Sequence, residues 1–303
     1  MTRPVLRAAT RSSPLARWQS AFVASHLAAI GIDVVEVLVD TLGDRTQIAN
    51  TPLHLIGGQG VFVKEVQAAV LAGHADLAVH SAKDLPALTP DGLVLASIPA
   101  RGEVRDMLIG STLDALPVGA VIGTGSVRRR AQLLHRRADL AFAEVRGNVG
   151  TRLAKAAQFD AIVLARVPLE RLNLLHGLHG ELLSTDVMLP MIAQGAIAVE
   201  CRVDDEATLE ALGLIDDAVA HAAVDCERAY LLRLGGGCEL PVAAYATIDG
   251  DTITLDALVA AHDGSEVLRR TATALLDDRL VLGALVADEI LGSGGSALLA
   301  HVG

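Results

Sequence analysis

Cysteine and aromatic residues are both scarce in this chain of 303 residues. The three cysteines stand at positions 201, 226 and 238 without a CxxC spacing, which predicts a reducing compartment and argues against a disulfide framework or a zinc site. Aromatic residues make up only 2% of the chain, so it lacks the stacking surfaces typical of proteins that bind single-stranded nucleic acid. No apolar run reaches the length of a membrane span, and the first ten residues lack the apolar segment of a secretory signal. We therefore expect a cytoplasmic protein with neither a nucleic acid nor a membrane as its partner.

Basic residues are outnumbered overall but are concentrated in one stretch. The formal net charge is −11, which argues against nucleic acid binding by the protein as a whole. Between Arg101 and Arg171, however, there are twelve basic and seven acidic residues, a balance of +5 that leaves −16 for the remainder. Eleven of the twelve are arginine, whose planar fork donates two parallel hydrogen bonds to a carboxylate. The clustering predicts a ligand that carries several carboxylate or phosphate groups.

The first two thirds of the chain repeat one pattern: an apolar strand, a short polar loop and an amphipathic helix. Strands are expected to begin near residues 4, 32, 75, 119, 140 and 159, and Pro14 is expected to start a helix that ends near Ile30, before Gly31. Hydrophobic residues make up 51% of the chain, enough for a large core. This alternation predicts α/β layers with a mainly parallel sheet.

The pattern changes after about residue 215. A helix is expected over residues 216–234, three strands joined by Asp-Gly turns over 240–274, and a last helix over 276–291. Cys226 falls on the apolar face of the first of these helices, and Cys201 falls in a strand. The pattern predicts a separate, small α+β domain with a three-stranded antiparallel sheet.

Four polar loops follow predicted strands, at residues 10–13, 80–84, 124–130 and 146–152. Ligands of open parallel sheets collect at the carboxyl ends of strands, and three of these loops open into helices, whose N-termini attract anions. The phosphate motifs GxGxxG and GxxxxGK[ST] are absent. Arg128 and Arg129 admit two interpretations, a solvated helix face or contact with the ligand, and their place on the first turn favours the ligand.

The loop "HSAKDLP" brings His80, Lys83 and Asp84 together. A carboxylate beside a lysine and several arginines stays ionised, so Asp84 is suited to stabilise a developing cation or to move protons. The alternative is a surface Lys–Asp pair of little energetic value. His80 follows an apolar strand, and the pattern leaves a core histidine and a site histidine equally open.

Cys238 lies in "LRLGGGCELP", behind three glycines and ahead of Pro241. Glycine permits positive φ and proline prevents helix continuation, so a mobile or tightly turned loop is expected after a helix. Two interpretations remain: a small residue at a turn, or a thiol that a large group must reach.

Six segments occur in order along essentially the whole chain: "LRAATRSSPLA", "VHSAKDLP", "GTGSVRR", "RGNVGTRL", "QGAIAVECR" and "GGCELP". Through them the chain resembles the hydroxymethylbilane synthases, also called porphobilinogen deaminases. The resemblance implies two α/β domains similar to type II periplasmic binding proteins, with a cleft between them, and a small C-terminal α+β domain. The implied boundaries are residues 1–96 with 196–214, residues 97–195, and residues 215–303.

The resemblance also implies the chemistry. Cys238 would hold a dipyrromethane cofactor by a thioether, and the enzyme would join four porphobilinogen molecules head to tail with loss of ammonia. It would then hydrolyse off the linear tetrapyrrole hydroxymethylbilane, in porphyrin (haem) biosynthesis, working as a monomer. Asp84 would be the catalytic carboxylate. The other implied cofactor-binding residues are Lys83, Ser13, Thr124, Ser126, Arg128, Arg129 and Arg146, and the implied substrate-binding residues are Arg11, Arg152, Arg171 and Phe62.

Some positions depart from the family pattern. Leu55 and Gln59 stand where the family often has GGKG and a second lysine upstream, Ala82 stands where methionine is common, and Ala193 where glycine is usual. Two other function classes compete with this one. A solute-binding protein for a polycarboxylate would need neither the third domain nor Cys238, and a cysteine-dependent acyl transferase would need a base near Cys238.

Overall fold

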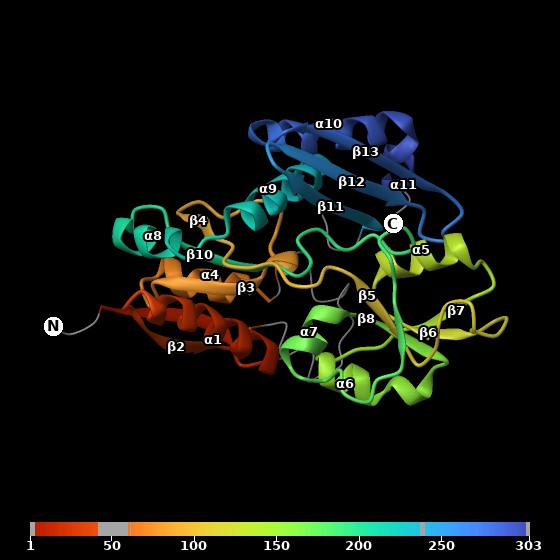
Figure 1. The fold of residues 1–303 in the computed structure, drawn as a ribbon, viewed down its shortest axis with the longest axis horizontal. Helices are drawn as coiled ribbons and strands as arrows, with labels where there is room; N and C mark the ends of the chain where they lie inside the picture. Colours follow the sequence, from red (N-terminus) through yellow and green to blue (C-terminus); the bar gives the residue numbers. More distant parts are fainter. Residues whose placement is uncertain (1–3, 42–59, 61, 237–239, 301–303) are drawn as a thin grey trace. The chain divides into compact units, whose positions relative to one another are not determined.

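The computed structural model describes residues 4–41, 60, 62–236 and 240–300. The chain forms two compact units, one of residues 1–102 with 195–221 and the other of residues 103–194 with 222–303. We call them unit 1 and unit 2. The chain therefore passes between the units after Gly102, Gln194 and His221. The predicted division into three domains stays a prediction, although each of the three sheets lies in one of the predicted stretches (Figure 1).

Unit 1 contains a five-stranded sheet in the order β2-β1-β3-β10-β4. β1 is parallel to β2 and β3, whereas β10 is antiparallel to both of its neighbours. β10 enters this sheet only after the chain has returned from unit 2. The strands are β1 (Val5–Arg11), β2 (Asp33–Val39), β3 (Leu77–Ser81), β4 (Leu93–Ser97) and β10 (Ile197–Arg202).

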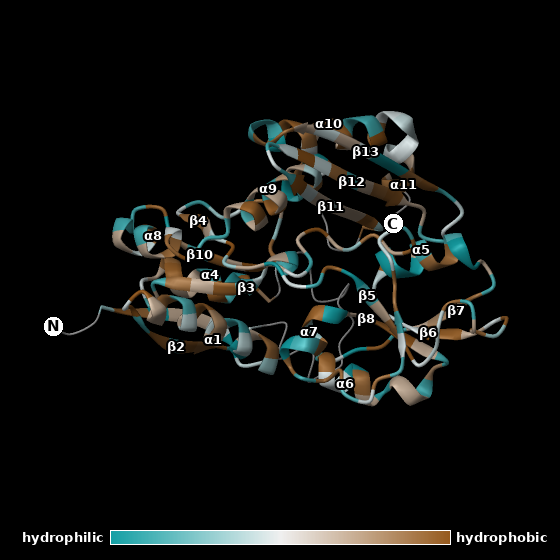
Figure 2. Ribbon diagram, viewed as in Figure 1, coloured by the Kyte–Doolittle hydropathy of each residue, from teal (hydrophilic) through white to brown (hydrophobic). Residues whose placement is uncertain are grey.

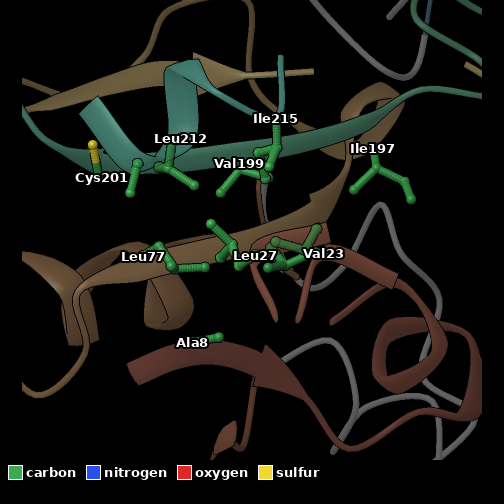
Figure 3. Packing of buried hydrophobic residues seen from close by; sticks show 11 residues of the cluster. Ala8, Val23, Leu27, Leu77, Ile197, Val199, Cys201, Leu212 and Ile215 are labelled. Atoms are coloured by element: carbon green, nitrogen blue, oxygen red, sulfur yellow. The ribbon is translucent and has the colours of Figure 1, made fainter. Parts of the chain in front are cut away.

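Helices cover both faces of this sheet. α1 (Pro14–Ala29) and α8 (Glu206–Gly213) pack on one face, where Leu77 and Val199 meet Leu27 in the cluster of Figure 3. α4 (Lys64–Leu71) packs on the other face. Because side chains alternate along a strand, every second residue of β3 and β10 is directed towards α4. A 3-10 turn, η1 (Ala82–Asp84), directly follows β3.

Unit 2 contains a second five-stranded sheet in the order β7-β6-β8-β5-β9. β6 is parallel to β7 and β8, but β5 is antiparallel to β8 and β9. In each large sheet four strands therefore run in one direction and one strand, β10 or β5, runs in the opposite direction, so the prediction of a mainly parallel sheet is confirmed. The antiparallel strands β5 and β10 each follow a passage between units, where no βα crossover sets the direction. The strands are β5 (Asp106–Ile109), β6 (Val121–Gly123), β7 (Ala141–Ala143), β8 (Ala161–Ala165) and β9 (Gly180–Leu182).

Two helices of this sheet, α5 and α6, begin at polar loops predicted from the sequence. Hydrophilic residues predominate in α5 (Figure 2), whose Leu133 nevertheless belongs to the hydrophobic core against this sheet. Ser126 caps α5 and Asn148 caps α6, and each side chain accepts a hydrogen bond from the backbone N–H three residues on. The elements are α5 (Val127–Arg136), α6 (Val149–Ala154), η2 (Ala156–Gln158) and α7 (Arg166–Arg171).

The C-terminal part has the predicted three-stranded antiparallel sheet, β11-β12-β13. Helix α9 (Ala218–Arg233) precedes it and buries Cys226, as predicted. The other elements are β11 (Val242–Asp249), β12 (Thr252–Ala260), β13 (Val267–Leu275), η3 (Leu276–Asp278), α10 (Arg279–Ile290), η4 (Leu291–Gly295) and α11 (Ser296–Ala300).

One helical segment in the described residues, Leu276–Ala300, is long and apolar enough to span a membrane by length and composition alone. The segment is not the uninterrupted apolar run considered in the sequence analysis, because charged residues, Asp288 and Glu289 among them, lie within it. The segment is kinked at Gly294, and α10 packs against β12 and β13. Its residues Leu282, Val286 and Ile290 are buried there. Within this segment, α10 therefore packs as a helix that covers one face of the C-terminal sheet.

Candidate functional site

A pocket of about 370 Å³, counting the space open to solvent, lies in unit 1 at the carboxyl ends of β1 and β3. Four of the residues predicted from the sequence line it: Arg11, Ser13, Phe62 and Asp84. Lys83 lies next to Asp84 in η1 and is partly exposed. The structure thus brings together the parts of the predicted site that come from three separate loops.

The first turn of α1 fixes one wall of the pocket. Ser13 is the N-cap and accepts a hydrogen bond from the N–H of Ala16 at 3.3 Å, and Pro14 is the first helical residue, as predicted. Arg11 ends β1, and its guanidinium carbon lies 4.2 Å from the centre of the Phe62 ring. A cation over an aromatic face is stabilised in that place, so Phe62 holds Arg11 at the pocket edge.

Hydrogen bonds hold the turn that carries Asp84. Ala82 donates its N–H to the carbonyl of Ala196 on the β10 side at 3.1 Å, and Gln19 of α1 donates to the Ser81 hydroxyl at 2.8 Å. In the described part of the chain, Asp84 forms no ion pair and no hydrogen bond through its side chain. A partly exposed carboxylate on a fixed backbone and beside Arg11 is suited to meet a positive charge on a ligand.

Arg128 and Arg129 do not form a solvated helix face, the first of the two interpretations weighed from the sequence. Both are buried, 3% and 6% exposed, and both bind the wholly buried carboxylate of Asp106 on β5, at 2.6 and 2.8 Å. Arg128 also donates to the carbonyl of Leu189, and Arg129 to that of Val163. Burial raises the pKa of Asp106, but the two arginines more than offset this and hold it below its ordinary value.

This cluster contains more positive than negative charge. Two guanidinium groups share one carboxylate, and burial lowers the pKa of Arg128. Among the residues that the structure describes, the Nε atoms of Arg128 and Arg129 have no hydrogen-bond acceptor. A buried cluster with one excess positive charge favours an anionic group nearby.

The remaining predicted residues of unit 2 lie in the loops and short helices that follow β6, β7 and β8. Thr124 is buried and donates its N–H to the carbonyl of Ala143, which joins the ends of β6 and β7. Arg146 donates to the carboxylate of Glu144, and Arg152 lies in the last turn of α6. Burial lowers the pKa of Arg171, at the end of α7, to about 10. The carboxyl ends of adjacent parallel strands lie at one edge of a sheet, where ligands of open α/β sheets bind.

The structure also shows polar residues that the sequence analysis did not single out. Glu200 is wholly buried on β10 and lies 3.3 Å from Nε2 of His80, and Gln67 of α4 donates to it at 2.8 Å. Asp106 is the second such residue. The signal for Glu200 was present in "AIAVECRV", because a lone carboxylate inside an apolar strand needs a buried partner.

Cys238, Leu55 and Gln59 lie outside the described residues. The chain before Cys238 is described as far as Gly236. Gly235 and Gly236 both have positive φ, +90° and +71°, after the end of α9 at Arg233, as expected for a turn that only glycine adopts readily.

The comparisons with known proteins agree along the chain. A family model described as porphobilinogen deaminase, dipyromethane cofactor binding domain, matches residues 6–210, and one described as porphobilinogen deaminase, C-terminal domain, matches residues 221–292. The chain is similar to the porphobilinogen deaminase of Syntrophotalea carbinolica, with 45% identity over 307 residues that cover 99% of this chain and 96% of that protein. It is equally similar to that of Trichlorobacter lovleyi, with 45% identity over 303 residues and coverage of 98% and 96%.

Similarity to solved structures is weaker. The probable amino-acid ABC transporter extracellular-binding protein ytmK from Bacillus subtilis aligns with a TM-score of 0.43 and 4% identity, covering 70% of this chain and 90% of that one. At this TM-score the likeness supports no conclusion about function.

Proposed function

The chain belongs to the porphobilinogen deaminase family, and on this premise we propose how its residues carry out the reaction. The enzyme is a transferase that condenses four porphobilinogen molecules with loss of ammonia and releases hydroxymethylbilane for tetrapyrrole biosynthesis. Its cofactor is a dipyrromethane. The family models also match the C-terminal part, which the solute-binding alternative does not require.

The cofactor is proposed to be held by Cys238 through a thioether and by arginines through its carboxylates. A dipyrromethane made from two porphobilinogen units carries an acetate and a propionate on each ring. The excess positive charge on Arg128 and Arg129, with two buried Nε–H groups that lack an acceptor among the described residues, fits such carboxylates. Thr124, Ser126 and Arg146 follow the ends of β6 and β7 and are proposed to bind the cofactor too. Ser13 and Lys83 of unit 1 are proposed as further cofactor-binding residues.

Asp84 is proposed to stabilise the charge that develops during condensation. When porphobilinogen loses ammonia, its aminomethyl carbon becomes part of a cationic azafulvene. A fixed carboxylate with no competing ion pair in the described structure is oriented towards such a cation before it forms. Arg11 lies in the same pocket and is proposed to bind a substrate carboxylate, with Phe62 holding it in place. Arg152 and Arg171 are proposed to bind further substrate carboxylates.

The observation that carries this proposal is that Arg11, Ser13, Phe62 and Asp84 line one pocket in a chain of this family. The first experiment is the intact mass of the denatured protein beside that of Cys238→Ser. We expect the wild type to exceed its sequence mass by two porphobilinogen units less two ammonias, and the variant to show no excess. If the wild type shows no adduct even after incubation with porphobilinogen, the proposed attachment is wrong.

The role of Asp84 is tested with a matched substitution. Asp84→Asn keeps the size of the side chain and removes its charge, and we expect kcat to fall by about 100-fold or more. Asp91→Asn, an exposed position in the same unit, is the control and should keep wild-type kcat. Equal kcat values for the two variants would show that Asp84 has no electrostatic role.

We further propose that the protein works as a monomer in the cytoplasm and that it binds neither nucleic acid nor a membrane. We also propose that it is organised as the three domains predicted from its sequence. The scarcity of cysteine supports a reducing compartment, the scarcity of aromatic residues and the net charge of −11 support the absence of nucleic acid, and the three separate sheets support three domains. A sedimentation experiment in solution that gives the mass of one chain, 31.5 kDa plus cofactor, would agree with this proposal. A mass twice as large would contradict it.

A further inference from the structure

The pocket that contains Asp84 has a buried acid–base pair in its wall. His80, at the end of β3, lines the pocket and is only 4% exposed. Its Nε2 lies 3.3 Å from Oε2 of Glu200, and the same oxygen accepts a hydrogen bond from Gln67 at 2.8 Å. Alternation along the two strands directs His80 and Glu200 towards α4, the helix that provides Gln67.

Two polar side chains contact the Glu200 carboxylate in the described structure, Gln67 through a hydrogen bond and His80 through its Nε2 atom. Glu200 is 0% exposed, and its other oxygen, Oε1, has no hydrogen-bond donor among the described residues. Nε2 of His80 and Oε2 of Glu200 do not form a hydrogen bond of good geometry, but at 3.3 Å a lone pair on Nε2 would face the negative charge of the carboxylate, whereas an N–H there is attracted to it. The proton of a neutral His80 ring therefore belongs on Nε2. This tautomer leaves Nδ1 as a hydrogen-bond acceptor.

We propose that His80 accepts, through Nδ1, a hydrogen bond from an N–H group of the porphobilinogen unit reacting beside Asp84, and that Glu200 is the positioning residue that fixes its ring and tautomer. The inference rests on the proposed function, since it assigns further residues to the same pocket. Porphobilinogen offers N–H groups on its pyrrole ring and its aminomethyl group. A fixed acceptor would orient the reacting unit, whereas the carboxylate of Asp84 stabilises its charge.

Two substitutions separate this role from a purely structural one. His80→Gln keeps an N–H donor near the position of Nε2, so Glu200 keeps its partner, but it lacks the acceptor at Nδ1. The double variant His80→Asn with Glu200→Gln places an amide oxygen near the position of Nδ1 and removes the buried charge that would otherwise be left without a partner. His74→Gln and His74→Asn, at an exposed position of unit 1, are the controls for the same substitutions.

The experiment measures kcat and KM for porphobilinogen, with the intact mass and the melting temperature of each variant as checks on cofactor loading and folding. We expect His80→Gln to lose about tenfold or more in kcat with an intact cofactor and fold, and the double variant to retain a clearly higher kcat than His80→Gln. The inference is overturned if His80→Gln keeps wild-type kcat, or if it equals or exceeds the double variant. A wild type that does not consume porphobilinogen would instead overturn the proposed function.

Discussion

Removal of the charge of Asp106 should strongly destabilise unit 2. The carboxylate is wholly buried and accepts hydrogen bonds from Arg128 at 2.6 Å, Arg129 at 2.8 Å and Gln194 at 3.1 Å. In Asp106→Asn, two buried guanidinium groups would remain without an anion. Breaking a buried ion pair from one side costs about 3–5 kcal/mol. Two hydrogen bonds to charged groups, at about 1.5–3 kcal/mol each, give a similar figure.

Calorimetry provides the assay for this prediction. At about 2–4 °C per kcal/mol for a folding unit of 150–250 residues, we expect Asp106→Asn to lower the melting temperature by about 6–20 °C. Arg130→Met, at an exposed position of the same helix, is the control and should change it little. The double variant Asp106→Asn with Arg129→Met should recover part of the loss because it leaves one buried cation instead of two. A change below about 1 kcal/mol in Asp106→Asn would refute the charge argument.

Three further predictions follow from single features. Ala193 has a φ of +57°, and its N–H is held by Glu227 at 2.6 Å, so Ala193→Gly should relieve backbone strain and raise stability by about 0.5–1 kcal/mol, measured as an upward shift of the melting temperature. The lowered pKa of Asp106 contributes stability that is complete above its unfolded pKa of about 4 and is lost as the pH falls below it. Acid unfolding followed by circular dichroism should therefore depend less steeply on pH in Asp106→Asn than in the wild type. Burial raises the pKa of the Cys201 and Cys226 thiols to about 11 and about 12, so iodoacetamide should label neither in the native protein, and early labelling of either would contradict their burial.

Local signals predicted the parts of the fold that depend on neighbouring residues. The start of α1 at Pro14 and the antiparallel sheet of the C-terminal part both follow from short-range patterns. The strand directions of β5 and β10 did not follow, because each strand pairs with partners far away in the sequence. The alternation of strands and helices predicts the direction of strands within consecutive βα units. It does not predict the direction of a strand that follows a passage of the chain from one unit to the other.

The same distinction applies to the candidate site. Loops at strand ends pointed to Arg11, Ser13 and Asp84, because strand ends are recognisable in a sequence. The burial of Arg128 was not predicted, because this residue lies on α5 and its partner Asp106 lies on β5, 22 residues earlier in the sequence. His80 and Glu200 likewise lie on strands that are neighbours in the sheet but are separated in the sequence by all the strands of the second sheet. Resemblance to a family identified the chemistry, but the buried partners required coordinates.

The position of β10 between β3 and β4 has a consequence for synthesis of the protein. About 100 residues separate the end of β4 from the start of β10, so a ribosome needs about 5–20 s to make them. During that time the sheet of unit 1 lacks an inner strand, and β3 and β4 are without their shared neighbour. Glu200 also arrives with β10, so the imidazole of His80 acquires its partner only then. The sheet that supports the candidate site of unit 1 is therefore completed late in translation, after the strands of the second sheet have been made.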